Sequence, residues 1–94
     1  MMDNVEIDGI IFRGTTVELL QGKLLIIQGQ TGMLGWGYFN LAVADKLGSA
    51  MAVVSGVNSY DDMLVRTVSA VSARAAELGV VPGMTGREAL LIMK

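Results

Sequence analysis

The sequence predicts an α+β fold: an N-terminal antiparallel β-meander followed by helices packed on one face, with one further short strand. Two observations carry this prediction. Apolar runs separated by two-residue turns fill the first part of the chain, and helical spacing with capping residues fills the last part. We expect a single domain over residues 1–94, with a mainly β-sheet, oligomerisation half at 1–38 and a mainly helical half at 39–94.

Composition excludes several classes of function. The chain has no cysteine and no histidine, which removes thiol nucleophiles, imidazole bases and nearly every zinc site, so we expect no metal and no cofactor. A net charge of −2 with scattered Lys and Arg argues against nucleic acid as a partner. The apolar content of 52%, against 17% charged residues, favours self-association in so small a domain.

Nothing in the sequence predicts a membrane partner. The start, Met-Met-Asp-Asn, lacks the basic and apolar regions of a secretory signal. Residues 24–44 are uncharged and match the length of about 20 residues that a membrane helix needs. Four glycines and four polar residues interrupt this stretch, so we reject a membrane span and expect a cytoplasmic protein.

Two hairpins are expected before the glycine-rich bend at residues 29–40. Asp8-Gly9 joins residues 5–7 to residues 10–12, and Asp-Gly between apolar runs is among the strongest hairpin signals. Gln21-Gly22, a weaker turn, joins residues 15–20 to residues 23–27. Residues 33–36, inside the bend, are a candidate fourth strand.

The two hairpins place their apolar residues on opposite faces of the sheet if the strand between them is regular. A bulge inserts one residue and reverses the faces beyond it, so we predict a bulge or sharp bend at Gly14. The alternative is two independent strands with a loop at Arg13-Gly14. With the bulge, the face covered by helices holds Val5, Ile7, Ile10, Phe12, Val17, Leu19, Leu24 and Ile26, and the oligomer interface holds Ile11, Leu20, Leu25 and Ile27.

The second half of the chain carries helix-capping residues at regular intervals. Ser, Thr, Asn and Asp are preferred at helix starts, and glycine is common just past helix ends. The expected elements are a helix at 40–47 capped by Asn40, a buried strand at 50–54, a short helix after Ser59, a helix over 68–78, and a last helix opened by a capping box of Thr85 and Glu88.

The glycine-rich bend and the helix starts are the candidate sites for a ligand. The glycine spacing fits neither a dinucleotide fingerprint nor a P-loop, so structural packing is the favoured interpretation of the bend. Helix starts can hold small anions, and an arginine there would add charge, although capping and ion pairing are the simpler explanations. The candidate ligand-binding residues are Trp36, Gly37, Asn40, Asn58, Ser59 and Arg87.

The part of the chain from residue 29 onward resembles the YunC-like family of small uncharacterised bacterial and archaeal proteins. The resemblance rests on Gly37 with the helix after it, on residues 56–64, and above all on Gly-Met-Thr-Gly-Arg-Glu-Ala-Leu at residues 83–90. It implies a tetramer assembled through the N-terminal sheet and implies no activity. Family members carry Cys-Gly and then Asp at the bend, where this chain has Trp36-Gly37 and Asn40, so a thiol or carboxylate role there is absent.

The leading functional prediction is a non-catalytic oligomeric module for small-molecule binding or assembly. No pair of Asp, Glu, Lys or Tyr has a recognisable catalytic spacing in the sequence. A small anionic ligand is the expected partner besides the chain itself. The alternative is a small metal- or substrate-dependent hydrolase or transferase that uses Asn40, Asn58, Ser59 or Arg87 near the bend.

Overall fold

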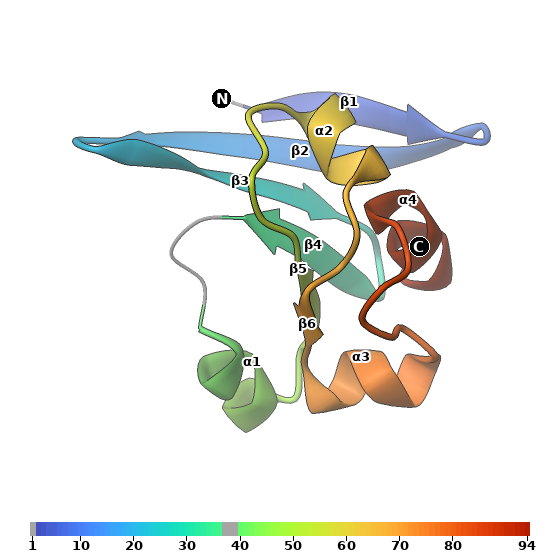
Figure 1. Cartoon of the computed structure of the whole chain (residues 1–94). Coiled ribbons are helices and arrows are strands. Elements are labelled where there is room, and N and C mark those ends of the chain that lie inside the picture. Colours follow the sequence, from blue (N-terminus) through green and yellow to red (C-terminus); the bar gives the residue numbers. More distant parts are fainter. Residues whose placement is uncertain (1, 37–39) are drawn as a thin grey trace.

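The strands in the described residues belong to one mixed sheet (Figure 1). A computed structural model describes residues 2–36 and 40–94. Neighbouring strands pair antiparallel except β4 and β5, which are parallel. The strands follow the sequence order across the sheet, as β1 (Met2–Ile7), β2 (Ile10–Leu19), β3 (Gly22–Gln28), β4 (Gly32–Trp36), β5 (Ala50–Val53) and β6 (Ala70–Val71). The predicted fold class, an α+β fold that begins with an antiparallel meander, is confirmed.

The first hairpin has the predicted turn. Asp8 and Gly9 both have positive φ angles, 52° and 81°, as a type I′ turn requires. Ile7 pairs with Ile10, and Val5 pairs with Phe12. The second hairpin is shifted by one residue from the prediction, since Leu19 pairs with Gly22 and the turn residues are Leu20 and Gln21.

The predicted bulge at Gly14 is wrong, and so is the alternative loop, because β2 continues without interruption from Ile10 to Leu19. Gly14 meets a different need. A side chain at this position would come within 2.8 Å of the Tyr60 ring and 3.0 Å of Val5. The glycine therefore lets Tyr60, on helix α2 (Tyr60–Val65), lie directly on the strand, where its hydroxyl is 2.7 Å from the Thr16 hydroxyl.

The regular strand reverses the predicted faces of the second hairpin. Leu25 and Ile27 were predicted at the oligomer interface, but they are 2% and 0% exposed in the core. Val17 and Leu19 were predicted under the helices, but they remain 42% and 40% exposed. The physical reason is the alternation of side chains along an unbroken strand, which no inserted residue resets at Gly14.

Helix α1 (Leu41–Leu47) lies between β4 and β5 in the chain and has the predicted caps. The Asn40 side chain accepts a hydrogen bond from the Ala42 N–H at 2.9 Å, and Gly48 ends the helix with a φ of 74°. The helix borders Met33 and Met51, which point away from the face that holds Leu34 and Ala52. Helix α1 therefore lies on the other side of the sheet from the main core.

The third predicted helix is shorter than expected. Residues 70–71 form strand β6, and the helix α3 (Ala73–Leu78) begins only after Ser72. The apolar residues before Ser72 were interpreted as one face of a helix, but they pair with β5 or pack in the loop before it. Short apolar runs do not distinguish a helix from a strand by periodicity alone.

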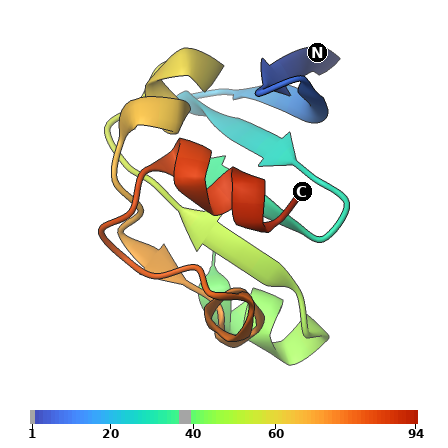
Figure 2. The same ribbon diagram turned by 90° about the vertical axis from the view of Figure 1, so that its right-hand side faces the viewer.

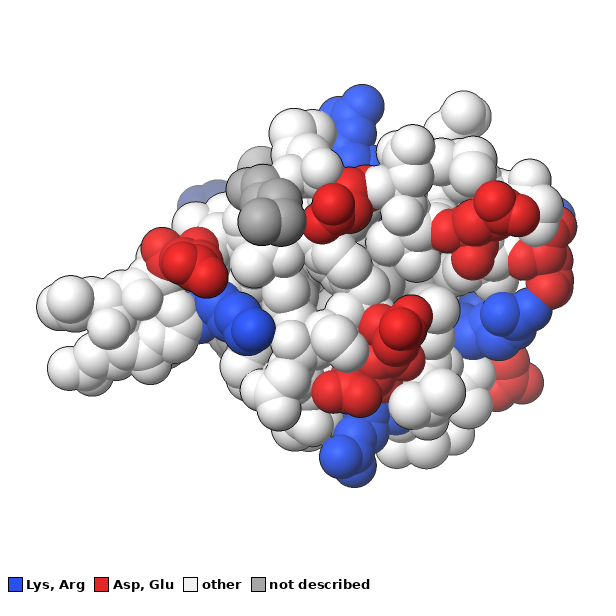
Figure 3. Space-filling model, turned by 90° about the horizontal axis from the view of Figure 1, so that it is seen from above, with Lys and Arg blue, Asp and Glu red and all other residues white. Residues whose placement is uncertain are grey.

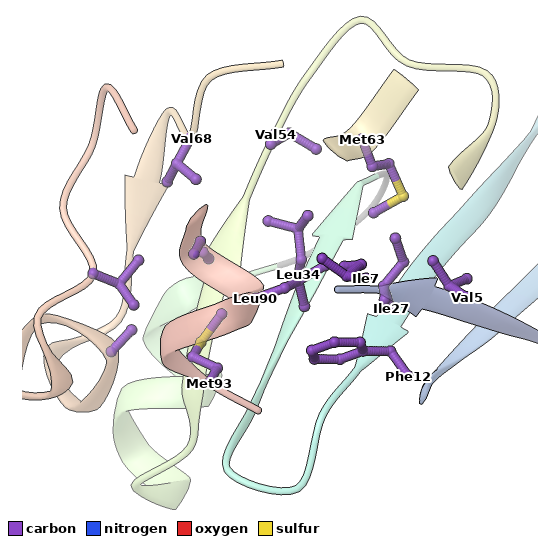
Figure 4. Packing of buried hydrophobic residues seen from close by; sticks show 14 of the residues in the cluster. Val5, Ile7, Phe12, Ile27, Leu34, Val54, Met63, Val68, Leu90 and Met93 are labelled. Atoms are coloured by element: carbon purple, nitrogen blue, oxygen red, sulfur yellow. The ribbon is translucent and has the colours of Figure 1, made fainter. Parts of the chain in front are cut away.

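Helix α4 (Gly86–Ile92) has the predicted capping box and closes the core. Figure 2 shows it lying across the sheet. The core that it shares with α2 and the strands is closely packed (Figure 4), with Ile7, Ile27, Leu34, Met63 and Leu90 all fully buried. Among the described residues, no helix is long and apolar enough to span a membrane.

Candidate functional site

The sheet face that points away from α2 and α4 carries several exposed apolar side chains. Along β2, Phe12, Gly14 and Thr16 point toward the helices, so the alternate residues point away. Pairing of Val17 with Leu24 and of Thr15 with Ile26 extends this second face onto β3. We call the apolar part of it the open face, formed by Ile11, Val17, Leu19, Leu24 and Ile26.

The β2–β3 hairpin extends the open face beyond the body of the molecule. In the described residues β1 begins opposite Thr15 and β4 ends opposite Leu25, so residues 17–24 form a two-stranded ribbon that we call the arm. Leu20, at its turn, is 99% exposed. Figure 3 shows the end of the hairpin standing away from the body, without charged groups at its extremity. Two-stranded ribbons are marginally stable in water by themselves.

An apolar hollow of about 330 Å³ lies on the same side of the sheet, beneath helix α1. Its floor is buried, since Ala44 and Met51 are only 7% and 4% exposed. Its rim is not, since Val43 and Leu47 are 52% and 73% exposed. The residues that line it are Met33, Asn40, Val43, Ala44, Leu47, Ser49 and Met51.

A second hollow, of about 290 Å³, is polar and lies beside the β3–β4 turn. Arg13 and Gln28 pair across β2 and β3 and line it together with Ile11, Gly29 and Gln30. Arg13 is exposed and forms no ion pair within the described residues. A guanidinium beside an amide is suited to a carboxylate or phosphate group.

The glycine-rich bend packs against the end of helix α4. The carbonyl oxygen of Met93 accepts hydrogen bonds from the N–H groups of Thr31 and Gly32, at 3.1 and 3.2 Å. A side chain at Gly29 would overlap the same oxygen, and one at Gly32 would come within 2.7 Å of the Met93 sulfur. This geometry agrees with the packing interpretation of these two glycines.

Three of the predicted site residues lie at helix starts. The Asn40 side chain caps α1, and the Ser59 hydroxyl accepts a hydrogen bond from the Asp62 N–H at 3.2 Å as the cap of α2. Asn58 is exposed, and its N–H donates to the Asp62 carboxylate at 3.1 Å. Helices α1 and α2 lie at opposite ends of the molecule in both ribbon views, so Asn40 is far from the other two (Figures 1 and 2).

The remaining predicted site residues are also dispersed. Arg87 forms an ion pair with Asp8 that joins α4 to the first hairpin turn, and both side chains are about half exposed. Trp36 ends β4 and packs against the core cluster. Gly37 lies outside the described residues. The structure does not bring Asn40, Trp36 and Arg87 into one described site, and the ligand-binding role of the set stays a prediction.

Titratable groups do not gather into a recognisable catalytic arrangement in the parts of the chain that the structure describes. Within those parts no three acidic residues meet as a metal site would require. Hydrogen bonds from the Thr85 N–H, at 2.9 Å, and from its hydroxyl, at 3.1 Å, lower the pKa of the Glu88 carboxyl. The capping box fully explains this pKa shift.

Ser72 is a structurally important residue that the sequence reasoning missed. It is fully buried, and its hydroxyl accepts from the N–H groups of Met51 and Ala75 and donates to the Ser49 carbonyl at 2.8 Å. It thereby connects β5, the end of α1 and the start of α3. The preference of serine for helix starts was the signal that could have located it.

The protein belongs to the class of small α+β proteins built on one mixed sheet, here of six described strands. Helices cover most of one face of the sheet, and the second face is accessible. The chain belongs to the family described as "Domain of unknown function (DUF1805)", whose model matches residues 35–93. The YunC-like resemblance found in the sequence is thereby confirmed.

Two related proteins extend the likeness over almost the whole chain. The chain is 29% identical to the uncharacterized protein YunC of Bacillus subtilis over 93 residues, which cover 95% of this chain and 92% of that protein. It is also similar to the crystal structure of TA1206, a protein of unknown function from Thermoplasma acidophilum, with a TM-score of 0.93 and 31% identity. That match covers 100% of this chain and 92% of the other.

Proposed function

We propose that this protein is a non-catalytic assembly module that forms a homo-oligomer through the open face and the arm. The exposure of the open face carries the proposal: Val17 and Leu19 are 42% and 40% exposed at successive outward positions of β2, beside Leu24 of β3, and Ile11 is 58% exposed further along the same face. Apolar surface of this kind marks protein interaction sites in soluble proteins. By the family resemblance the oligomer is a tetramer.

Charges around the open face support a copy of the same chain as the partner. Arg13 on β2 and Glu6 on β1, which pairs with Ile11, point to the same side of the sheet as the open face. A surface with both signs of charge around an apolar centre can match itself across a two-fold axis. The dispersed positions of Asn40, Ser59 and Arg87 support a role without catalysis.

Light scattering on the wild-type protein and two matched variants tests the proposal. Val17→Glu places a charge on the open face, and Val81→Glu is the control, because Val81 is 52% exposed in the loop between α3 and α4. We expect an oligomeric wild type and control, and a folded monomer for Val17→Glu. A monomeric wild type at micromolar concentration would refute the assembly. Leu25→Glu is unsuitable because Leu25 is buried.

A second candidate function is the binding of a small anionic ligand in the polar hollow beside the β3–β4 turn. Arg13, which lacks an ion-pair partner within the described residues, is the observation that favours it. Thermal shift with phosphate, citrate and other small carboxylates tests it. Stabilisation of the wild type but not of Arg13→Gln would support the site, and equal stabilisation of both would exclude it.

A further inference from the structure

We propose that the free edges of β1 from two copies of the chain pair antiparallel across a two-fold axis and join two open-face dimers into a tetramer. The inference rests on the proposed function, because it requires assembly through the open face. It adds a second interface: one isologous contact closes into a dimer, and a tetramer with dihedral symmetry needs another. The partner is a second copy of this chain.

The sheet has one long free edge in the part of the chain that the structure describes. β1 stands at one end of the strand order with six residues, and β6 stands at the other with two. Figure 1 shows β1 along the upper margin of the sheet. Edge strands are commonly protected by proline, lysine or a bulge. Within Met2–Ile7 there is no proline or lysine, and pairing with β2 is regular, so this edge can accept another strand.

The first hairpin turn determines which backbone groups of β1 face outward. In a two-residue hairpin the residues that flank the turn form a hydrogen-bonded pair, and such pairs alternate along antiparallel strands. Ile7 and Ile10 flank the turn, so every second residue of β1, counted back from Ile7, bonds to β2. The alternate residues direct their N–H and C=O groups to the free edge, and they are Met2, Asn4 and Glu6. No backbone hydrogen bond joins these groups to another described segment.

One register matches two copies of this edge. With Asn4 opposite Asn4 of the second copy, Met2 of each molecule faces Glu6 of the other, and all the outward backbone groups find partners. The same register places Asp3 opposite Val5 on the helix side of the sheet. Each acidic side chain therefore faces an uncharged one, which is the favourable arrangement for cross-strand pairs.

The neighbouring registers are less favourable. A shift by two residues in one direction sets Asp3 directly against Asp3 of the second copy, and like charges in that position are destabilising. A shift by two residues in the other direction leaves Met2 beyond the end of the paired strand. A shift by one residue sets outward groups against groups that already bond to β2. Charge and hydrogen bonding thus both select the register centred on Asn4.

Pairing at the edge is compatible with assembly through the open face. A two-fold axis perpendicular to the sheet keeps the open faces of both molecules on the same side, so two such layers can stack face to face. Two edge contacts then form at once between two open-face dimers, and each raises the effective concentration for the other. A single edge contact between monomers lacks this reinforcement, so disruption of the open face by Val17→Glu still gives a monomer.

Asn4→Pro tests the edge, because proline removes the N–H at the centre of the pairing. Proline is tolerated on an edge strand where the N–H faces solvent, so the β1–β2 hydrogen bonds remain. By light scattering we expect a tetrameric wild type, a dimeric Asn4→Pro, and a tetrameric control, Asn4→Thr, which keeps the N–H. A tetrameric Asn4→Pro, or a dimeric wild type that only Val17→Glu dissociates, would refute the edge pairing and leave the open-face assembly intact. A monomeric wild type would refute both.

Disulfide trapping tests the register without disturbing the backbone, since the natural chain contains no cysteine. Hydrogen-bonded antiparallel pairs have Cα atoms about 5.5 Å apart, within the range of a disulfide, so Asn4→Cys should form a covalent dimer on mild oxidation. Glu6→Cys is the control: because Glu6 faces Met2, its two copies lie roughly 13 Å apart along the strands and should stay reduced. Crosslinking of Glu6→Cys, or a tetramer in which Asn4→Cys does not crosslink, would overturn the register.

Discussion

Gly86→Ala is the substitution for which the structure makes the sharpest stability prediction. Gly86 is the first residue of α4, and it is buried where α4 crosses α2. A Cβ atom there would overlap the carbonyl oxygen of Met63 and come within 2.8 Å of a Leu34 methyl group. The Gly86 N–H also donates to the Arg66 carbonyl at 2.9 Å, which holds the two helices together at this point.

The magnitude follows from comparing two opposed effects. Alanine improves helix propensity over glycine by about 1 kcal/mol in a helix interior and by less at a first residue. To relieve the overlap, α2 and α4 must separate by roughly 1–1.5 Å, and such gaps forfeit a quarter or more of the dispersion energy of the contacts that line them. Overpacking of this kind typically costs about 1–3 kcal/mol, so we expect net destabilisation in that range.

Denaturant and thermal unfolding, monitored by the fluorescence of the only tryptophan, Trp36, measure the effect. In a domain of this size each kcal/mol lowers the melting temperature by about 4–8 °C. All proteins are compared at one concentration, because assembly would make stability concentration-dependent. Gly14→Ala is the matched comparison and should cost less, because its neighbours are side chains that can move. A Gly86→Ala protein as stable as the wild type would refute the reasoning.

The remaining predictions concern single contacts. Thr85→Ala should lower the free energy of unfolding by about 0.5–2 kcal/mol through loss of the cap, and light scattering should show unchanged assembly. Because folding lowers the pKa of Glu88, its carboxylate stabilises the folded protein above the ordinary carboxyl pKa of about 4.3. This stabilisation is lost as the pH falls through the pKa of the folded state. The melting temperature of Glu88→Gln should therefore depend less on acid pH than that of the wild type. Ser72→Ala should cost about 1–3 kcal/mol by calorimetry, because buried backbone groups lose their partner. Arg87→Ala should change the free energy of unfolding by less than about 1 kcal/mol, because its ion pair with Asp8 is about half exposed. If the wild type shows a catalytic turnover that Arg87→Ala or Asn58→Ala abolishes with folding intact, the non-enzymatic proposal is overturned.

Sequence reasoning located the elements that depend on local chemistry. The Asp8-Gly9 turn and the caps Asn40, Ser59 and Thr85 were found, because each satisfies backbone groups within a few residues. It failed at Gly14, because the reason for that glycine lies in Tyr60, far away in the chain. A glycine within a strand is the local signal both for a bulge and for a close packing contact, and only tertiary contacts distinguish the two.

The error at Gly14 also determined which residues were assigned to the interface. The predicted bulge placed Val17 and Leu19 under the helices, because a bulge reverses the faces of the strand beyond it. The structure places the small residues inward, where Tyr60 needs the space, and leaves the larger residues on the open face. When the alternation of side chains along a strand leaves an apolar face exposed, a protein partner is expected to cover that face. The exposed face can be recognised only when the strand register is known.

Residues 83–90, which lie within the part of the chain that matches the family, are explained by packing in the described structure. Gly83 has a φ of 98°, Thr85 and Glu88 cap α4, Gly86 permits the contact with α2, and Leu90 is fully buried. Arg87 is the exposed charged side chain among them that this packing does not require, and its partner Asp8 belongs to a surface turn. A specific motif of this kind therefore records how α4 docks onto the sheet, and the search for function belongs on the open face, the arm and the hollow beneath α1.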